Sequence, residues 1–299
     1  MTRLLIVGCG DVGQRVLRLL PAGLRPSVLT RRPSQAWRDW NVKPLAGDLD
    51  APASLARLAG CFDAVMHLAP PPNAGETDSR TRNLIRALSR GTPPQRFVYI
   101  STTGVYGDHR GRLVEETSTC SPASSRARRR LDAEDSLRRW ASRNAVRLSV
   151  LRAPGIYAAD RSGHPRERIL AGRPLLCREE DVFTNHIHAD DLAQACWRAL
   201  WLSAPLRVHN ITDDSARLMG DHYDLAADIL GLPRLPRHPL SEIEQLLSPS
   251  YVSYMRESRR ISNKRMKREL KLRLTYPLPE HGWVTEHAAN MPAKSQEST

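Results

Sequence analysis

Apolar runs alternate with helical patterns along the first half of the chain. Residues 4–7 are four apolar residues in a row, which predicts a buried strand, and residues 12–20 then place apolar side chains at helical spacing. Further runs that predict strands lie at 27–30, 42–46, 63–69, 96–101 and 148–151. Strands that alternate with helices in this way predict an α/β fold with a doubly wound parallel sheet.

The alternation loosens after residue 152. Residues 189–202 predict a helix that packs on the sheet, and 207–211 predict one more strand. We therefore expect a smaller C-terminal lobe beside the sheet. The predicted division is a sheet domain over 1–152, to which 186–211 return, a lobe over 153–185 and 212–282, and a flexible polar tail over 283–299.

The first predicted strand runs directly into a glycine-rich turn. Gly8, Gly10 and Gly13 form a GxGxxG pattern between this strand and the first predicted helix. In nucleotide-binding folds the first glycine allows the tight turn, the second lets the backbone approach a pyrophosphate, and the third lets helix and strand pack closely. The helix N-terminus then binds the phosphates. The context favours dinucleotide binding over the alternative, an ordinary glycine turn.

Charge at the end of the second predicted strand indicates which dinucleotide is bound. An acidic residue there would accept a hydrogen bond from the ribose 2′-OH and select NAD. This chain instead has Arg31 and Arg32, with no carboxylate before Asp39. Arginine can bind a 2′-phosphate through two hydrogen bonds. We therefore expect NADP, with NAD as the alternative, and surface arginines beside a turn as the other interpretation.

Composition narrows the class of protein. The net charge is +13, but the basic residues are spread over the chain and aromatic residues make up only 5%, so we expect no nucleic acid partner. The five cysteines are widely spaced without a CxxC pair, which is typical of unpaired thiols in the cytoplasm. No apolar run reaches the ~20 residues of a membrane span, and the start leaves no room for a signal peptide.

Short motifs follow one another in order over nearly the whole chain. Besides the glycine turn they are GDL at 47–49, HLA at 67–69, STTGVYG at 101–107, LRAPGIY at 151–157, HIHADDLA at 186–193, VHNITDD at 208–214 and RISN at 260–263. Together they resemble the short-chain dehydrogenase/reductase superfamily, in its extended or atypical branch of NAD(P)-dependent epimerase/dehydratase-like proteins. The resemblance implies a Rossmann-type sheet, a C-terminal substrate lobe and a homodimer.

The resemblance also assigns cofactor contacts to residues that follow the predicted strands. It places Asp48 and Leu49 beside the adenine, and residues 154–156 at the nicotinamide carboxamide. Packing at the edge of the sheet is the alternative for these positions. The residues expected to bind the cofactor are Gly8, Gly10, Asp11, Val12, Gly13, Arg31, Arg32, Asp48, Leu49, Ala69, Pro70, Ser101, Arg130, Pro154, Gly155 and Ile156.

One feature of the family is missing between residues 121 and 134. Family enzymes carry a tyrosine followed four residues later by a lysine, where the tyrosine moves a proton and the lysine lowers its pKa. Arg126 and Arg130 stand at these two positions. Arginine does not release a proton near neutral pH, so Arg126 is a poor general acid, whereas Arg130 can still bind ribose or phosphate.

Other side chains must then assist the reaction. The resemblance places the Thr102 hydroxyl next to a substrate oxygen, and we name Thr102 and Tyr106 as the catalytic candidates. Asp108 and His109 are further substitutes for the missing acid. The alternatives are an ordinary strand-end threonine, a packed tyrosine and solvated loop residues.

The segment from His186 to Asp191 contains part of a metal-binding pattern. Imidazoles and carboxylates at such spacing bind zinc when a loop brings them together. The residues that follow instead predict a helix with Asp190 or Asp191 as its N-cap. No further histidine-rich segment completes a site, so we expect no metal.

These observations predict an NAD(P)-dependent oxidoreductase or nucleotide-sugar epimerase/dehydratase-like enzyme with a non-standard proton donor. It would transfer a hydride between nicotinamide and the carbonyl or carbinol of a small substrate, such as a phosphorylated molecule or a sugar nucleotide. The alternative, motivated by the missing tyrosine and lysine, is a catalytically silent NADP(H)-binding regulator that senses redox state.

Overall fold

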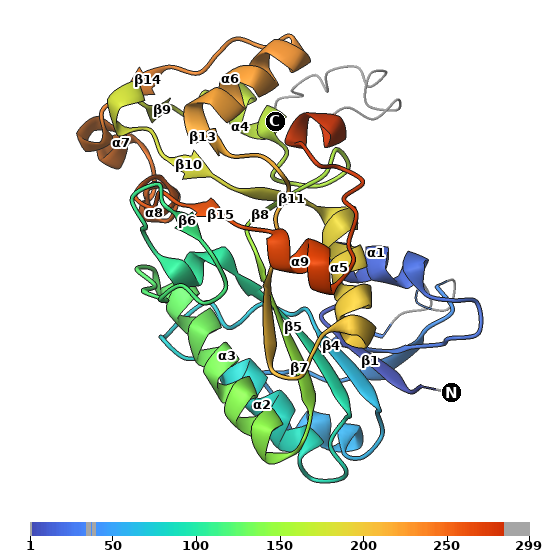
Figure 1. Ribbon diagram of the computed structural model, residues 1–299. Coiled ribbons are helices and arrows are strands. Elements are labelled where there is room, and N and C mark those ends of the chain that lie inside the picture. Colours follow the sequence, from blue (N-terminus) through green and yellow to red (C-terminus); the bar gives the residue numbers. More distant parts are fainter. Residues whose placement is uncertain (1, 34–36, 38–39, 284–299) are drawn as a thin grey trace, which may run out of the picture.

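Figure 1 shows the computed structural model, which describes residues 2–33, 37 and 40–283. Within these residues a seven-stranded parallel sheet has the order β12-β7-β5-β4-β1-β2-β3. Its strands are β1 (Leu4–Val7), β2 (Ser27–Thr30), β3 (Lys43–Ala46), β4 (Ala64–His67), β5 (Arg96–Thr102), β7 (Arg147–Ala153) and β12 (Arg207–Asn210). The order reverses between β1 and β4, as in Rossmann-type folds, so the predicted doubly wound sheet is confirmed.

Helices cover both faces of this sheet. One face carries α1 and α5, and the opposite face carries α2 and α3 (Figure 1). The four helices are α1 (Asp11–Leu19), α2 (Ser79–Leu88), α3 (Ser125–Arg143) and α5 (Ala189–Leu202), and a 3-10 helix spans Pro52–Leu58.

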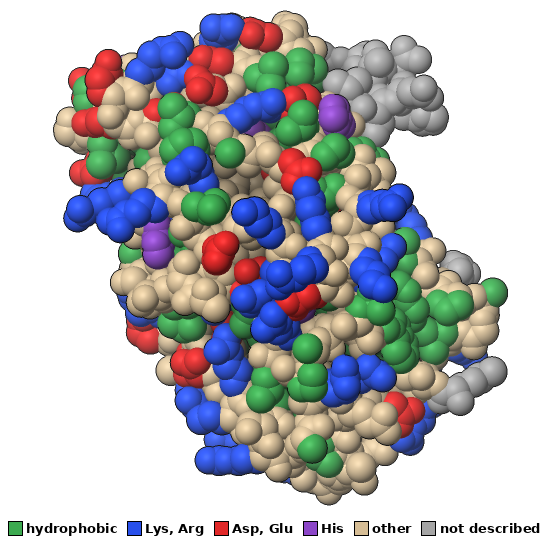
Figure 2. Space-filling view, in the orientation of Figure 1, with side chains coloured by type: hydrophobic (Ala, Val, Ile, Leu, Met, Phe, Trp, Pro, Cys, Tyr) green, Lys and Arg blue, Asp and Glu red, His purple; other side chains and the backbone are tan. Residues whose placement is uncertain are grey.

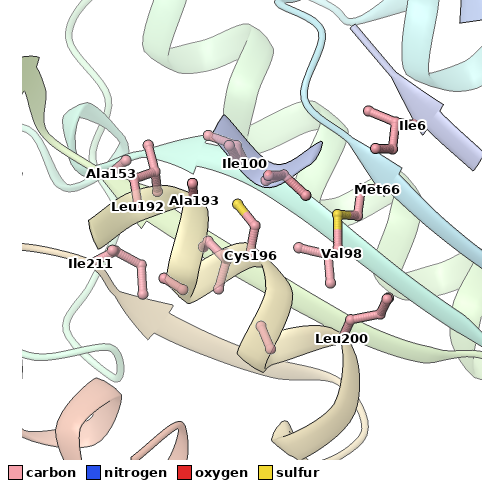
Figure 3. Close-up of a cluster of buried hydrophobic side chains, with 14 of the residues drawn as sticks. Ile6, Met66, Val98, Ile100, Ala153, Leu192, Ala193, Cys196, Leu200 and Ile211 are labelled. Carbon is pink, nitrogen blue, oxygen red and sulfur yellow. The ribbon is translucent and has the colours of Figure 1, made fainter. Parts of the chain in front are cut away.

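The two faces of the sheet each form a hydrophobic core. Figure 3 shows part of one, in which Met66 and Val98 of the sheet lie against Cys196 of α5. On the other face, Phe97 packs edge-to-face on Trp140 of α3, with their ring centroids 5.6 Å apart. Burial on both faces explains why the central strands, such as β1, are continuous apolar runs in the sequence.

The end of β4 sets the geometry of the later site. Residues 63–69 were expected to form one strand, but the regular strand ends at His67. The N–H groups of Leu68 and Ala69 both donate to the Val7 carbonyl, at 2.8 and 3.1 Å. This brings Ala69 directly against the turn that follows β1.

A smaller lobe lies beyond the carboxyl ends of the strands (Figure 1). Its own core contains Tyr157, Val182, Met219 and Trp283. Trp283 is 1% exposed, so it belongs to this core and not to the tail predicted from 283; residues 284–299 lie outside the described residues. We propose that residues 153–185 and 212–283 form the lobe.

Short elements build the lobe and join it to the sheet. The antiparallel pair is β10 (Phe183–Thr184) with β13 (Arg217–Leu218). The parallel pairs are β8 (Gly155–Tyr157) with β11 (His186–His188), β9 (Leu175–Leu176) with β14 (Arg237–His238), and β6 (Leu113–Val114) with β15 (Arg260–Ile261). Its helices are α4 (Pro165–Leu170), α6 (Met219–Leu230), α7 (Leu240–Leu246) and α8 (Pro249–Met255). A further helix, α9 (Lys264–Glu269), returns to the sheet, where Met266 is buried in the same core as α5.

Charged side chains are distributed over the surface. Figure 2 shows basic residues over the whole visible face, with acidic residues between them. All five cysteines are free thiols. Within the part of the chain that the structure describes, no helix has the length and apolar character needed to cross a membrane.

Candidate cofactor and substrate site

The glycine turn after β1 has a conformation that fits only glycine at its first position. Gly8 has a φ of +84°, and a Cβ built on it would lie 2.4 Å from the backbone nitrogen of Ala69. A side chain here would force the turn and the loop after β4 apart. Gly8 is therefore required at this turn by its positive φ and by the close approach of Ala69.

Gly10 leaves the start of α1 open. It is the N-cap residue, it makes no side-chain cap, and a Cβ added to it would meet no described atom within 4 Å. The first N–H groups of an α-helix have no partner within the helix and attract anions. The open N-terminus of α1 can thus accept a phosphate group.

A cavity of about 360 Å³ lies over this turn, at the carboxyl ends of β1 to β4. Cavities of this size and position bind nucleotides in open α/β sheets. The predicted cofactor residues that line it are Gly8, Gly10, Arg31, Asp48, Leu49, Ala69 and Pro70.

The two arginines after β2 differ in position. Arg31 lines the cavity and Arg32 does not. The chain turns at this point, where the N–H of Arg32 donates to Thr30 Oγ1 at 3.3 Å. Arg31 is therefore the arginine whose position supports the predicted contact, and the contact of Arg32 stays a prediction. Asp39 lies outside the described residues.

Sequence reasoning missed Arg80, which lines the same cavity from the first turn of α2. Its Nε and Nη2 donate to the two carboxylate oxygens of Asp50 at 2.8 and 2.7 Å, and Nη1 donates to the Pro70 carbonyl at 3.2 Å. These hydrogen bonds from Arg80 hold the pKa of Asp50 below its usual value. Arg80 thus joins the loops after β3 and β4. The sequence offered one indication of this role, because Arg80 stands four residues before the buried Leu84 and therefore at the start of the predicted helix.

Three residues at the start of α1 do not line the cavity. Val12 packs against the sheet core, and a Cβ on Gly13 would lie 3.0 Å from Cys9 Sγ. Gly13 therefore allows the helix to pack on the turn itself. Asp11 binds Arg15 and Arg161 through its two carboxylate oxygens, each at 3.0 Å.

Ser101 is directed into the protein interior. It is 3% exposed and donates to Glu134 Oε1 at 2.6 Å. Glu134, which is fully buried, also accepts two hydrogen bonds from Arg152, at 3.0 and 2.6 Å. The Ser101 hydroxyl thus supports this buried ion pair, and the predicted contact between Ser101 and the cofactor stays a prediction.

The two catalytic candidates lie in different environments. Tyr106 is fully buried, donates to Asn210 Oδ1 at 2.7 Å, and has the Arg152 guanidinium 4.7 Å from its ring centre. Burial raises the pKa of Tyr106 to about 12. This placement favours the alternative of a packed tyrosine, and the catalytic role of Tyr106 stays a prediction.

Thr102 ends β5 and remains partly exposed. Its Oγ1 accepts a hydrogen bond from the N–H of Gly104 at 3.2 Å. A hydroxyl that accepts one hydrogen bond still has its own proton to donate. Thr102 can therefore donate to a substrate oxygen at this strand end.

The arginines that replace tyrosine and lysine both have partners. The Arg126 guanidinium lies 4.4 Å from the ring centre of Tyr254 in α8. Arg130 Nη1 donates to the Ile100 carbonyl at 2.7 Å and to the Tyr99 hydroxyl at 3.1 Å. Arg126 thus joins α3 to the lobe, and the ribose contact of Arg130 stays a prediction.

A second cavity, of about 480 Å³, lies where the start of α3 meets the lobe. Asp108 and Ser124 line it on the sheet side, and Val252, Arg256 and Glu257 line it on the lobe side. A cleft between a nucleotide-binding sheet and a second lobe is a common place for a substrate. It is the candidate substrate pocket.

Pro154, Gly155 and Ile156 lead from β7 into β8. Gly155 is exposed, and the Ile156 carbonyl accepts a hydrogen bond from Arg161 Nη1 at 2.9 Å. Since Arg161 also binds Asp11, this segment faces the start of α1. Residues 154–156 therefore lie near the helix start that we expect to bind the cofactor phosphates. Their contact with the nicotinamide carboxamide stays a prediction.

The histidine motif before α5 has a structural use. His188, not an aspartate, is the N-cap, because its Nδ1 accepts from the N–H of Asp190 at 3.2 Å. Asp190 binds Arg15, and Asp191 accepts from the N–H groups of Thr275 and Tyr276. Among the described residues, no group of three or more histidines, cysteines or carboxylates converges as a metal site would require.

The strand order, the glycine turn and the cavity at the carboxyl edge define a Rossmann-type fold with a candidate dinucleotide site. Residues 4–211 match the model of the NAD dependent epimerase/dehydratase family. The chain belongs to that family, which confirms the resemblance predicted from the motifs. A search of curated proteins finds no match.

Solved structures share the fold over nearly the whole chain. A conserved protein of unknown function from Silicibacter pomeroyi is 28% identical, with a TM-score of 0.78 and coverage of 95% of this chain and 97% of that one. MoeE5, solved with UDP-glucose and NAD, is 20% identical (TM-score 0.72, coverage 94% and 96%). A UDP-glucuronic acid 4-epimerase from Bacillus cereus, solved with NAD, is 17% identical (TM-score 0.72, coverage 91% and 93%).

Proposed function

We propose that the chain is an NAD(P)-dependent oxidoreductase of the epimerase/dehydratase type, acting on the carbonyl or carbinol of a small substrate. The observation that carries this proposal is the Gly8–Ala69 contact beside the open N-terminus of α1 and the cavity above it. The bound nicotinamide would supply or accept the hydride. Family membership and relatives solved with NAD support the same cofactor class.

The charge at the adenosine end of the cavity supports NADP, with NAD as the alternative. Arg31 lines this end, and it is close enough to Asp50 to help lower the pKa of that carboxyl group. Arg31 can bind a 2′-phosphate, which an NAD-selecting carboxylate at the end of β2 would repel.

Thr102 is the residue that we assign to the substrate oxygen. A Cβ on Gly104 would lie 3.4 Å from Thr102 Oγ1 and 3.6 Å from the Ala127 side chain, so Thr102 lies near the first turn of α3. The candidate substrate pocket is lined by Ala123 and Ser124, directly before that turn. Thr102 does not itself line that pocket. In this proposal it would orient and polarise an oxygen of a substrate that extends from the pocket towards the end of β5, by donating its proton in a hydrogen bond.

The substrate class follows from the relatives and stays a proposal. MoeE5 was solved with UDP-glucose, so sugar nucleotides and other phosphorylated carbonyl compounds are the first to test. We also propose a cytoplasmic homodimer; the free state of the five cysteines supports the reducing compartment.

The second candidate function is a catalytically silent NADP(H)-binding regulator. The observation that favours it is the pair of arginines on α3, where Arg126 lies on Tyr254 and Arg130 donates to the Ile100 carbonyl. Neither can supply the proton that the family's tyrosine moves.

One experiment separates the two functions. NADPH oxidation is followed with a panel of aldehydes, ketones and sugar nucleotides, using the wild type and Thr102→Val. Turnover that falls at least about tenfold in Thr102→Val, with NADPH affinity unchanged, supports the enzyme and the role of Thr102. NADPH binding without turnover on the whole panel supports the regulator.

A further inference from the structure

Asp11 places a carboxylate at the helix start to which the proposed function assigns the cofactor phosphates. It is the first residue of α1, next to the N-cap Gly10. A carboxylate at this position would repel a diphosphate that approaches the helix N-terminus, unless a cation neutralises it. The structure supplies two cations, because Arg15 Nε donates to Asp11 Oδ1 and Arg161 Nε donates to Asp11 Oδ2, both at 3.0 Å.

The two arginines differ in their freedom to move. Arg15 is 6% exposed and also binds Asp160 and Asp190, so three carboxylates hold it in place. Arg161 has a quarter of its side chain exposed (24%) and binds one carboxylate, Asp11. Arg161 is therefore the cation that can exchange its partner.

Arg161 also lies in a segment that faces the start of α1. Its Nη1 donates to the Ile156 carbonyl at 2.9 Å, in the segment that faces the start of α1. The side chain thus spans from the loop after β8 to the helix that flanks the cofactor cavity. Because Arg161 binds the first residue of α1, its guanidinium lies beside the N-terminus of this helix. Arg161 does not line the cofactor cavity, so a contact with an anion there requires a change of its side-chain rotamer.

We propose that Arg161 is a ligand of the cofactor diphosphate and that Asp11 holds it in place until the dinucleotide binds. On binding, the guanidinium passes from the Asp11 carboxylate to a phosphate oxygen, while Arg15 continues to neutralise Asp11. No covalent bond changes. The inference rests on the proposed function, since it needs a dinucleotide in this cavity, and it adds a residue outside the glycine turn.

The test measures NADPH and NADH affinity by calorimetry for the wild type, Arg161→Gln, Arg161→Lys and Asp11→Asn. Arg161→Gln is expected to weaken binding by about ten- to a hundredfold, the loss of a charge-assisted hydrogen bond. Arg161→Lys is expected to keep most of the affinity because it retains the charge. Arg166→Gln, an exposed position in the following helix α4, is the matched control and should bind as the wild type does.

Asp11→Asn distinguishes a ligand from a purely structural ion pair. If Arg161 binds phosphate itself, Asp11→Asn frees it and removes a repelling charge, so affinity is unchanged or higher. If the ion pair only holds the loop, Asp11→Asn weakens binding as much as Arg161→Gln does, and the proposal is overturned. Thermal unfolding of each variant identifies any loss caused by misfolding.

The outcomes also separate this inference from the proposed function. A wild type that binds neither NADPH nor NADH overturns both. A wild type that binds, together with an Arg161→Gln variant of equal affinity, overturns only the role of Arg161.

Discussion

Arg80 binds both carboxylate oxygens of Asp50 and so fastens the first turn of α2 to the loop after β3, at the adenosine end of the cavity. Bidentate pairs of this kind are the strong class of surface ion pair. Because Arg80 also holds the Pro70 carbonyl, its removal frees two of the loops that form the cavity.

Arg80→Ala is expected to speed the release of bound NADPH several-fold, with little change in the folded structure. A chase experiment with excess unlabelled nucleotide measures this rate. Arg86→Ala, at an exposed position on the same helix, is the control. Equal release rates for Arg80→Ala and the wild type would contradict a role of Arg80 in holding the cofactor.

Arg31 is expected to decide between the two dinucleotides. Arg31→Gln should weaken NADPH by about tenfold or more while NADH changes little, because only NADPH carries the 2′-phosphate. Arg32→Gln, which removes the neighbouring charge outside the cavity, should leave both affinities unchanged. Parallel titrations with the two nucleotides check this, and an equal loss for both would refute the assignment of Arg31.

Changing Gly8 to alanine is expected to reduce stability, whereas changing Gly10 to alanine is expected to reduce NADPH affinity. Gly8→Ala forces a positive φ on alanine and a contact with Ala69, so the unfolding free energy should fall by about 2 kcal/mol or more. Gly10→Ala has room for its Cβ and should fold normally, but this Cβ would occupy the path of the diphosphate. Urea unfolding combined with NADPH titration separates the effects, with Gly23→Ala as a control that alters neither.

Asp213 makes stability depend on pH. It is 2% exposed, with Ser215 bonded to Oδ1 and no partner for Oδ2 within the described residues, and burial raises its pKa to about 7. A folded pKa above the unfolded value stabilises the fold at low pH, and this contribution is lost as pH rises from about 4 through 7.

Asp213→Asn is therefore expected to be more stable than the wild type at pH 8, by up to a few kcal/mol, since one pKa unit corresponds to about 1.4 kcal/mol. The difference should shrink towards pH 4. Thermal unfolding at both pH values measures it, with Asp135→Asn, at an exposed position of α3, as the control. A variant that is less stable than the wild type at pH 8 would contradict this account.

The sequence pattern predicted the sheet well because its central strands are buried on both faces and are followed by turns. The strand expected at 207–211 and the helix at 189–202 correspond to β12 and α5 almost residue for residue. The residues of the glycine turn were also found, since local spacing alone determines that turn. Arg31 and Asp48 lie where their position after a strand indicated.

The parts that sequence could not predict depend on contacts between distant segments. Arg161 binds Asp11 across 150 positions, and Arg80 binds Asp50 across 30. The directions of the Ser101 and Tyr106 side chains could not be predicted for the same reason, because they are set by their partners Glu134 and Asn210. Side-chain direction at a strand end follows the packing of the layers, and no local pattern records it.

The measurement that tests the account most directly is an isothermal titration of the purified wild-type chain with NADPH and, separately, NADH. We predict saturable binding of one dinucleotide per chain at submillimolar concentration, with NADPH the tighter of the two. No binding heat with either nucleotide at millimolar concentration would contradict the assignment of the glycine turn as a dinucleotide site.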